Sequence, residues 1–200
     1  MTKNPQKVAV FIDNSNILLT MHHRKKIGER YWNKAYCPKI LARKLIGNRT
    51  LVFIGFYCAP PPSYLQVGDE ADKNRYALAT RYYSLVDKTE GITIHYATVN
   101  GSRGNLQEKN LDSRMTVDIV KMAATNQYDT AIIVSNDADY VPAVEGAKEF
   151  GKKVEVVYFA NQGSMELRQK CDIPRKAKPK FFVEIDGYRT ADFEYIKREC

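Results

Sequence analysis

Aspartates stand at or shortly after the ends of two apolar runs in this chain. Asp13 follows the run Val8–Ile12. Asp137 and Asp139 follow the run Ala131–Val134. Such runs predict buried strands, and in α/β proteins ligands bind outside the carboxyl ends of parallel strands. The spacing therefore predicts that carboxylates from two strands meet at one sheet edge, where their oxygens suit a hard divalent cation.

A third source of carboxylates is the helix predicted over residues 110–124. Its apolar stripe consists of Leu111, Met115, Ile119 and Met122. Asp112 and Asp118 fall on the two margins of this stripe, so both lean toward the core. Burial of an unpaired carboxylate is costly, and such a residue needs a cation, a hydrogen-bond network or a functional cavity. Asp112 and Asp118 are therefore further candidates for the acidic site.

Each of these aspartates also has a purely structural interpretation. The alternatives are capping for Asp13 and Asp137, helix-dipole compensation for Asp112 and Asp139, and pairing with Arg114 or Lys121 for Asp118. A single residue does not separate the two interpretations. Several acids that converge on one edge favour a functional site, because the structural alternative has to explain each of them separately.

Polar side chains beside the acids are candidate supporting groups. Asn14, Ser15 and Asn16 follow Asp13 directly, and Ser135 ends the fourth apolar run. Amides and hydroxyls in such places orient carboxylates or a water, as groups behind a metal site do. Turn and cap chemistry is the alternative, with equal weight for Ser15.

The chain alternates between strand and helix patterns from end to end. Strands are predicted over residues 7–12, 50–58, 92–99, 130–134, 154–159 and 181–184. Helices are predicted over 14–26, 38–47, 70–86, 110–124, 141–150 and 164–170. Residues 27–37 and 100–104 are predicted to be loops, and 174–180 a basic linker. This alternation predicts an α/β fold whose parallel sheet is covered by helices on both faces.

The composition narrows the classes of partner. Among 200 residues, 31 are basic and 23 acidic, a formal charge of +8 that favours phosphate-rich partners such as nucleic acid. We expect no leader peptide and no membrane span. The four cysteines are scattered without a CxxC pair, which predicts no zinc site, reduced thiols and a cytoplasmic location. Neither a P-loop nor GxGxxG occurs, which argues against nucleotide-cofactor enzymes.

Three ordered segments carry a family resemblance. FIDNSN (residues 11–16) resembles the F-I-D-x-x-N opening of NYN domains. EKNLD (108–112), with Val117 and Asp118, resembles their E-K-G-V-D helix start. VSNDADYVP (134–142) resembles S-G-D-x-D-F-x-P. The chain is similar over residues 7–185 to a LabA-like (DUF88) NYN domain, within the PIN-like nuclease superfamily.

The resemblance implies a three-layer α/β/α sandwich with a mainly parallel sheet over residues 1–185. Residues 186–200 are then a C-terminal extension, expected to form a short helix. It also implies hydrolysis of RNA by clustered acids with Mg²⁺ or Mn²⁺. Asp13, Asp112 and Asp137 carry over as metal ligands, with Asp139 and Asp118 as further catalytic acids. Asn110 and Asn136 stand where glycine is usual, and asparagine is the residue that best tolerates positive φ after glycine.

Single-stranded RNA or RNA loops are the expected partner, and a homodimer is compatible with the family. The candidate RNA contacts are Arg24, Lys25, Lys26, Tyr31, Trp32 and Arg103, with Lys73, Arg75 and Arg81 as further options. A solvated charge or a packed aromatic is the alternative for each of them. Two other functions stay open: a catalytically inactive RNA- or protein-binding module of the same fold, and a metal-dependent phosphatase or phosphotransferase acting on a small molecule.

Overall fold

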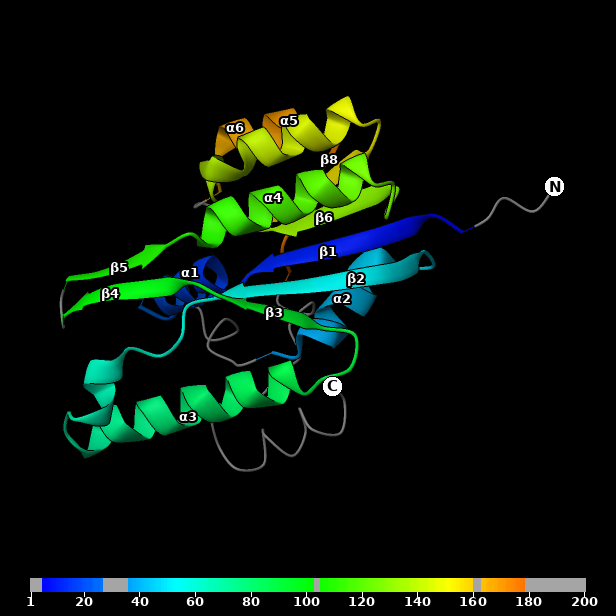
Figure 1. The fold of residues 1–200 in the computed structure, drawn as a ribbon. Coiled ribbons are helices and arrows are strands. Elements are labelled where there is room, and N and C mark those ends of the chain that lie inside the picture. Colours follow the sequence, from blue (N-terminus) through cyan, green and yellow to red (C-terminus); the bar gives the residue numbers. More distant parts are fainter. Residues whose placement is uncertain (1–4, 27–35, 103–104, 160–162, 179–200) are drawn as a thin grey trace.

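The computed structural model describes residues 5–26, 36–102, 105–159 and 163–178 (Figure 1). The strands are β1 (Lys7–Asp13), β2 (Thr50–Cys58), β3 (Thr93–Tyr96), β4 (Thr98–Ser102), β5 (Asn105–Lys109), β6 (Thr130–Val134), β7 (Lys153–Tyr158) and β8 (Ile173–Lys176). The α-helices are α1 (Asn14–Lys26), α2 (Pro38–Ile46), α3 (Glu70–Asp87), α4 (Leu111–Ala124), α5 (Val141–Glu149) and α6 (Met165–Lys170). Two short 3-10 turns, η2 (Ser63–Gln66) and η3 (Ala138–Tyr140), complete the order.

Six strands form one parallel sheet in the order β3-β2-β1-β6-β7-β8. From β1 the chain continues to β2 and β3 on one side, and later to β6, β7 and β8 on the other. The direction of winding therefore reverses between β1 and β6, which pair from Val8↔Thr130 to Ile12↔Val134. Such a topological switch point opens a crevice at the carboxyl ends of the two strands.

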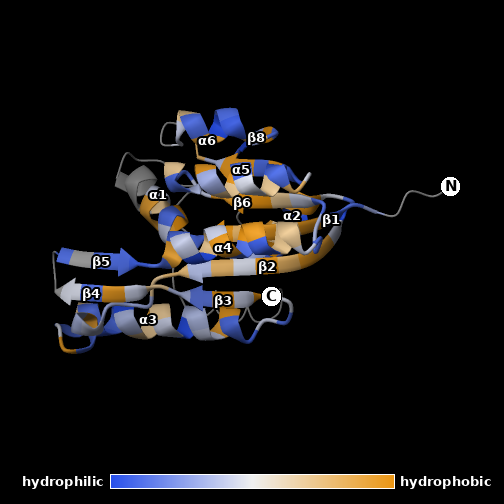
Figure 2. Ribbon diagram, turned by 45° about the horizontal axis from the view of Figure 1, so that its top comes forward, coloured by the Kyte–Doolittle hydropathy of each residue, from blue (hydrophilic) through white to orange (hydrophobic). Residues whose placement is uncertain are grey.

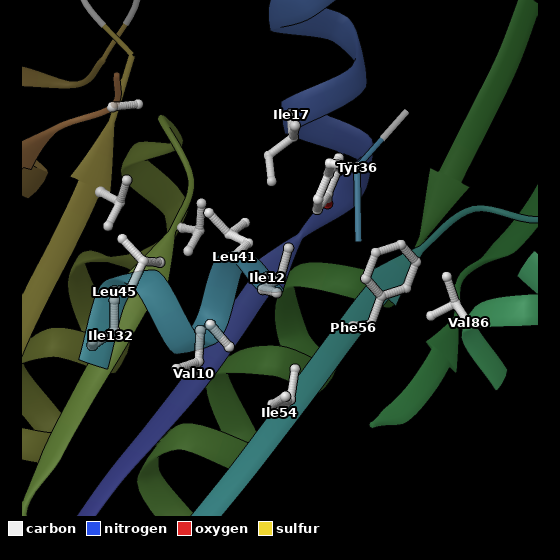
Figure 3. Packing of buried hydrophobic residues seen from close by; sticks show 14 of the residues in the cluster. Val10, Ile12, Ile17, Tyr36, Leu41, Leu45, Ile54, Phe56, Val86 and Ile132 are labelled. Atoms are coloured by element: carbon white, nitrogen blue, oxygen red, sulfur yellow. The ribbon is translucent and has the colours of Figure 1, made fainter. Parts of the chain in front are cut away.

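Helices cover both faces of this sheet and make the three layers that the sequence predicts. One core lies under α1, α2 and α3, and the other under α4, α5 and α6. In Figure 2 the strands between the helix layers are coloured largely hydrophobic, as expected for a parallel sheet buried on both faces. Figure 3 shows Leu41 and Leu45 of α2 beside Val10 and Ile12 of β1 in the first core.

The prediction of one strand over residues 92–99 followed by a loop over 100–104 is wrong in part. Strand β3 ends at Tyr96, and residues 98–102 form β4, which pairs antiparallel with β5. This hairpin extends beyond the carboxyl ends of β1 and β2 (Figure 1). Residues 100–102 include turn formers, and their pairing in β4 depends on the mainly polar residues 105–109, whose sequence carries little strand signal.

The basic segment 174–180 is also not simply a linker. Residues Ile173–Lys176 form β8, the edge strand beside β7, and Pro174 is tolerated there because an edge strand has one unpaired side. The strand predicted at 181–184 and the extension at 186–200 lie outside the described residues. The prediction of four reduced thiols fails at Cys37, which is disulfide-bonded, whereas Cys58 and Cys171 are free thiols. Spacing along the chain does not report which thiols the fold brings together. None of the described helices is long and apolar enough to cross a membrane.

Candidate active site

Asp13 is the centre of the candidate site. It ends β1 at the switch point, and only 3 % of the residue is exposed. Its carboxylate accepts hydrogen bonds from the Asn16 backbone N–H (3.0 Å), the Ser135 hydroxyl (3.0 Å) and the Tyr140 hydroxyl (3.2 Å). Burial raises the pKa of Asp13 from 3.8 to about 6, and the charge of Asp112 raises it as well. The hydrogen bonds lower this pKa only in part.

Tyr140 joins two of the carboxylates. Its hydroxyl lies 2.8 Å from Asp112 Oδ1 and 3.2 Å from Asp13 Oδ2. A phenol has one proton to donate, so the two carboxylates share a single donor. Burial, together with the negative charges of Asp13 and Asp112, raises the pKa of Tyr140 and keeps the hydroxyl protonated. The sequence analysis missed Tyr140, although a tyrosine that opens a helix beside an acidic motif is a plausible polar anchor.

Asp112 reaches this place because of the turn before α4. Asn110, the residue before the helix, has φ 70°, in the left-handed region. The expectation that asparagine replaces glycine in a positive-φ turn is thus confirmed at this position. Asp112 lies in the first turn of α4, where a carboxylate also favours the helix dipole. Leu111 and Met115 are buried beneath it, as the predicted apolar stripe requires.

Three carboxylates open onto one pocket of about 120 Å³, hereafter the acidic pocket. Asp13 comes from β1, Asp112 from α4 and Asp137 from the segment after β6. Asp137 also caps η3, because its side chain accepts the Asp139 N–H at 3.1 Å. The structural and functional interpretations of Asp137 are therefore both compatible with the structure. A fourth acid, Glu108 of β5, lines the same pocket through the unpredicted hairpin.

The other two predicted acids lie outside the acidic pocket. Asp139 is exposed and is absent from the residues that line it. Asp118 accepts hydrogen bonds from the Tyr57 hydroxyl and from Arg114 Nε, both at 2.9 Å, and lies 3.5 Å from His95 Nε2. The ion pair with Arg114 is the structural alternative that the sequence offered for Asp118.

The predicted supporting residues divide between the site and the core behind it. Ser135 donates to Asp13 and accepts the Asp137 N–H at 3.2 Å, so it ties the two acids together. Asn16 lines the pocket, and its side chain accepts the Asn136 N–H at 3.0 Å. Asn14 faces away from the acids, because its side chain accepts the Tyr36 hydroxyl at 2.9 Å.

Asn136 does not have the positive φ that its glycine-like position in the motif predicts. The positive-φ residues among the described non-glycines are Asn110 and Asn126. The Asn136 side chain instead connects three segments: its amide donates to Thr20 Oγ1 (2.9 Å), and its oxygen accepts the Phe159 N–H (2.7 Å). Glycine could not make these bonds, so here the asparagine serves as a buried cross-link.

The predicted RNA contacts fall mostly beyond what the structure describes. Tyr31, Trp32 and Arg103 lie outside the described residues, as do the side chains of Arg24, Lys25 and Lys26. Their role stays a prediction.

The donor chemistry of the acidic pocket fits a hard divalent cation. Its acids offer only oxygen ligands, and the charge of Asp112 raises the pKa of Asp13, a repulsion that a cation would relieve. Among the described residues, no three His, Cys, Asp or Glu side chains form a preassembled metal-binding group. Mg²⁺ keeps several of its waters in protein sites, so ligation partly through water suits this arrangement.

Comparison with known proteins agrees with this fold. The NYN domain profile matches residues 7–176, and the chain belongs to the NYN domain family, part of the PIN-like nuclease superfamily. An uncharacterized protein of Methanocaldococcus jannaschii is 37% identical over 89 residues, which span 44% of this chain and 37% of that protein. A crystal structure of a protein of unknown function from Vibrio parahaemolyticus has a similar fold. Its TM-score is 0.61 at 15% identity, over 92% of this chain and 99% of that one.

Proposed function

We propose that this chain is a metal-dependent ribonuclease of the LabA-like (DUF88) branch, hydrolysing RNA phosphodiester bonds at the acidic pocket. One observation carries the proposal. Carboxylates of Asp13, Asp112 and Asp137 come from three separate elements and line one pocket at the topological switch point. Capping or dipole compensation accounts for Asp112 and Asp137 singly. Asp13 also caps the start of α1 through the Asn16 N–H, but capping does not require a carboxylate that is buried at the cost visible in its raised pKa.

Asp13, Asp112 and Asp137 are the residues that would hold Mg²⁺ or Mn²⁺, with Glu108 at the rim of the pocket. When bound, such an ion lowers the pKa of a coordinated water and neutralises charge on the phosphate. The Tyr140 hydroxyl holds the carboxylates of Asp13 and Asp112 in place, and Ser135 orients Asp13 against Asp137.

RNA is the substrate that family and charge favour together. The superfamily is one of nucleases, and a formal charge of +8 attracts a polyanion even though the pocket itself is acidic. Single strands and loops are preferred in this proposal, because a phosphodiester that enters a recessed pocket is more accessible outside a duplex. We propose further that the domain extends to about residue 185, slightly beyond the matched residues.

The test is cleavage of end-labelled single-stranded and hairpin RNA with Mn²⁺, Mg²⁺ or EDTA. Asp112→Asn and Asp137→Asn are expected to lower the rate by about 100-fold or more. Asp139→Asn is the matched control, since it makes the same change two residues from Asp137 on an exposed side chain. We expect it to keep most of the activity. Equal cutting by all variants would assign the activity to a contaminant.

The alternative function is an RNA-binding module without catalysis. It is supported by the lack of a preassembled metal-binding group among the described residues. Metal-independent, salt-sensitive retention of RNA without cleavage by any protein of the series would select it over the nuclease.

A further inference from the structure

A second pocket adjoins the acidic pocket and has the opposite character. It has a volume of about 270 Å³ and lies between the start of α1, the proline segment after β2, and the β4–β5 hairpin. We call it the proline-lined pocket. Its apolar walls are Leu18 and Leu19 on one side, Pro60–Pro62 on another, and Val99 opposite. Neither lysine nor arginine is among the described residues that line it.

The two pockets share part of their lining. Ser15, Leu19 and Glu108 line both of them, so a ligand held at the acids borders directly on the apolar walls. Ser15 also fixes the shared wall, because its hydroxyl oxygen accepts the Ala59 N–H at 3.2 Å where the proline segment begins. The prolines have fixed φ and no N–H to donate, which makes this wall rigid and apolar.

A third, outer pocket of about 180 Å³ continues the path. It shares Pro60–Pro62 and Val99 with the proline-lined pocket and adds Tyr64 and Gly101. The three pockets thus follow one another from the acids, along the proline segment, to the aromatic side chain of Tyr64 in η2. Successive pockets of this kind suit successive units of a polymer better than one small molecule.

Leu19 supports the assignment of a ligand to this path. It is 71% exposed, although it is a large apolar side chain at the junction of the first two pockets. An exposed leucine alone is ordinary, but one at the shared rim of two pockets contributes apolar area that a ligand would cover.

We propose that the proline-lined pocket receives an unpaired nucleobase next to the phosphodiester held at the acidic pocket, and that the outer pocket receives the next base. The inference rests on the proposed function for the position of the phosphodiester. An uncharged planar base matches apolar walls, whereas a phosphate would meet no lysine or arginine among the described residues that line this pocket. Because a base can enter only when it is splayed out of a helix, the enzyme selects single strands.

The experiment measures binding separately from cleavage. Single-stranded RNA oligonucleotides carry one abasic nucleotide, moved stepwise along the strand, and bind to Asp112→Asn protein with Mn²⁺ present. Wild-type protein then cuts the unmodified strand, which locates the scissile bond. We expect abasic nucleotides at one or two consecutive positions beside that bond to weaken binding by about 5- to 100-fold, and those elsewhere to have little effect.

Leu19→Ala in the same background tests the pocket itself. It should weaken binding of the intact strand several-fold and flatten the abasic profile. Val117→Ala is the control, because Val117 is also exposed, at 57%, but lies on α4 and lines none of these three pockets. Because both side chains are exposed, both variants should fold, and circular dichroism checks this.

The outcomes separate the two proposals. A flat abasic profile with normal cleavage overturns the base pocket and leaves the nuclease standing. Duplex RNA that binds as tightly as single strands also overturns the base pocket. A position-dependent profile without cleavage supports the pocket and refutes the nuclease. No binding of any strand overturns both.

Discussion

Replacing Asp13 by asparagine should stabilise the folded protein at alkaline pH while removing activity. The carboxylate is buried at the end of β1, and burial raises its pKa from 3.8 to about 6. The folded state therefore disfavours the ionised form that the unfolded chain carries above pH 4. Asparagine has nearly the same shape without the charge. Its oxygen still accepts the Asn16 N–H, and the hydroxyls of Ser135 and Tyr140 can turn to suit the amide.

The size of the effect follows from linkage. A pKa difference of one corresponds to about 1.4 kcal/mol, so the rise from 3.8 to about 6 destabilises the ionised folded state by about 3 kcal/mol. Because the folded state holds the proton more tightly, wild-type stability decreases as pH rises from about 4 to 6 and is constant beyond that. Asp13→Asn removes this cost of ionising a buried carboxyl. The variant should be more stable by up to about 3 kcal/mol at pH 8, and the gain should vanish near pH 4.

Urea unfolding of both proteins at pH 8, 6 and 4, with EDTA to exclude metal binding, measures the difference. Asp112→Asn is the control, since its carboxyl lies at the more open start of α4 and should show a smaller gain. The reasoning is refuted if Asp13→Asn is less stable than wild type at pH 8, or if the difference does not change with pH. Either result would mean that the three hydrogen bonds, rather than desolvation, dominate at Asp13.

Three further predictions test the site. Tyr140→Phe removes a hydrogen bond that lowers the pKa of Asp13, so an NMR titration should place that pKa above the wild-type value. Unfolding should also show a loss of about 1.5–3 kcal/mol, and an unchanged Asp13 pKa would contradict the shared-donor geometry. Mn²⁺ should stabilise folded wild-type protein by about 2.7 kcal/mol when its concentration is a hundred times Kd, which raises the melting temperature. Asp112→Asn should show a much smaller rise. Equal shifts in both proteins would place the ion elsewhere. Asn110→Ala should lower the free energy of unfolding by about 1–2 kcal/mol, because φ is 70° at this position, whereas Asn110→Gly should not lower it. Calorimetry that finds the two variants equally stable would exclude backbone strain as the cause.

Much of the fold could be predicted because its signals are local. Strands β1, β2, β6 and β7 of the parallel sheet are short, mainly apolar runs, and strands β2 and β6 have the predicted bounds. Helix α4 shows its buried side in its 3.6-residue period, which also put Asp112 and Asp118 on the margins of the stripe. The exceptions are segments with weak local signals. Both β5, which is polar, and β8, which contains a proline, exist because a neighbouring strand offers hydrogen bonds.

The candidate site could be predicted only in outline. The sequence by itself determined that acids follow β1 and β6 and open α4, since strand ends and the first turn of a helix are positions along the chain. Which acids share a pocket was decided by the tertiary structure, because that depends on distances between elements. The sequence offered Asp118 as a further catalytic acid beside Asp137, yet Tyr57 and Arg114 hold Asp118 outside the acidic pocket.

Tertiary structure alone also decided what surrounds the acids. Tyr140 reaches two carboxylates because η3 turns the chain back over the switch point, and no spacing in the sequence reports that turn. The raised pKa of Asp13 depends on burial, which is a property of the packed molecule. The proline-lined pocket likewise exists only where α1, the segment after β2 and the hairpin meet. Residue type and order determine the chemistry available to this protein, and packing determines which groups act on one another, because charge and hydrogen bonding act over a few ångströms of space rather than along the chain.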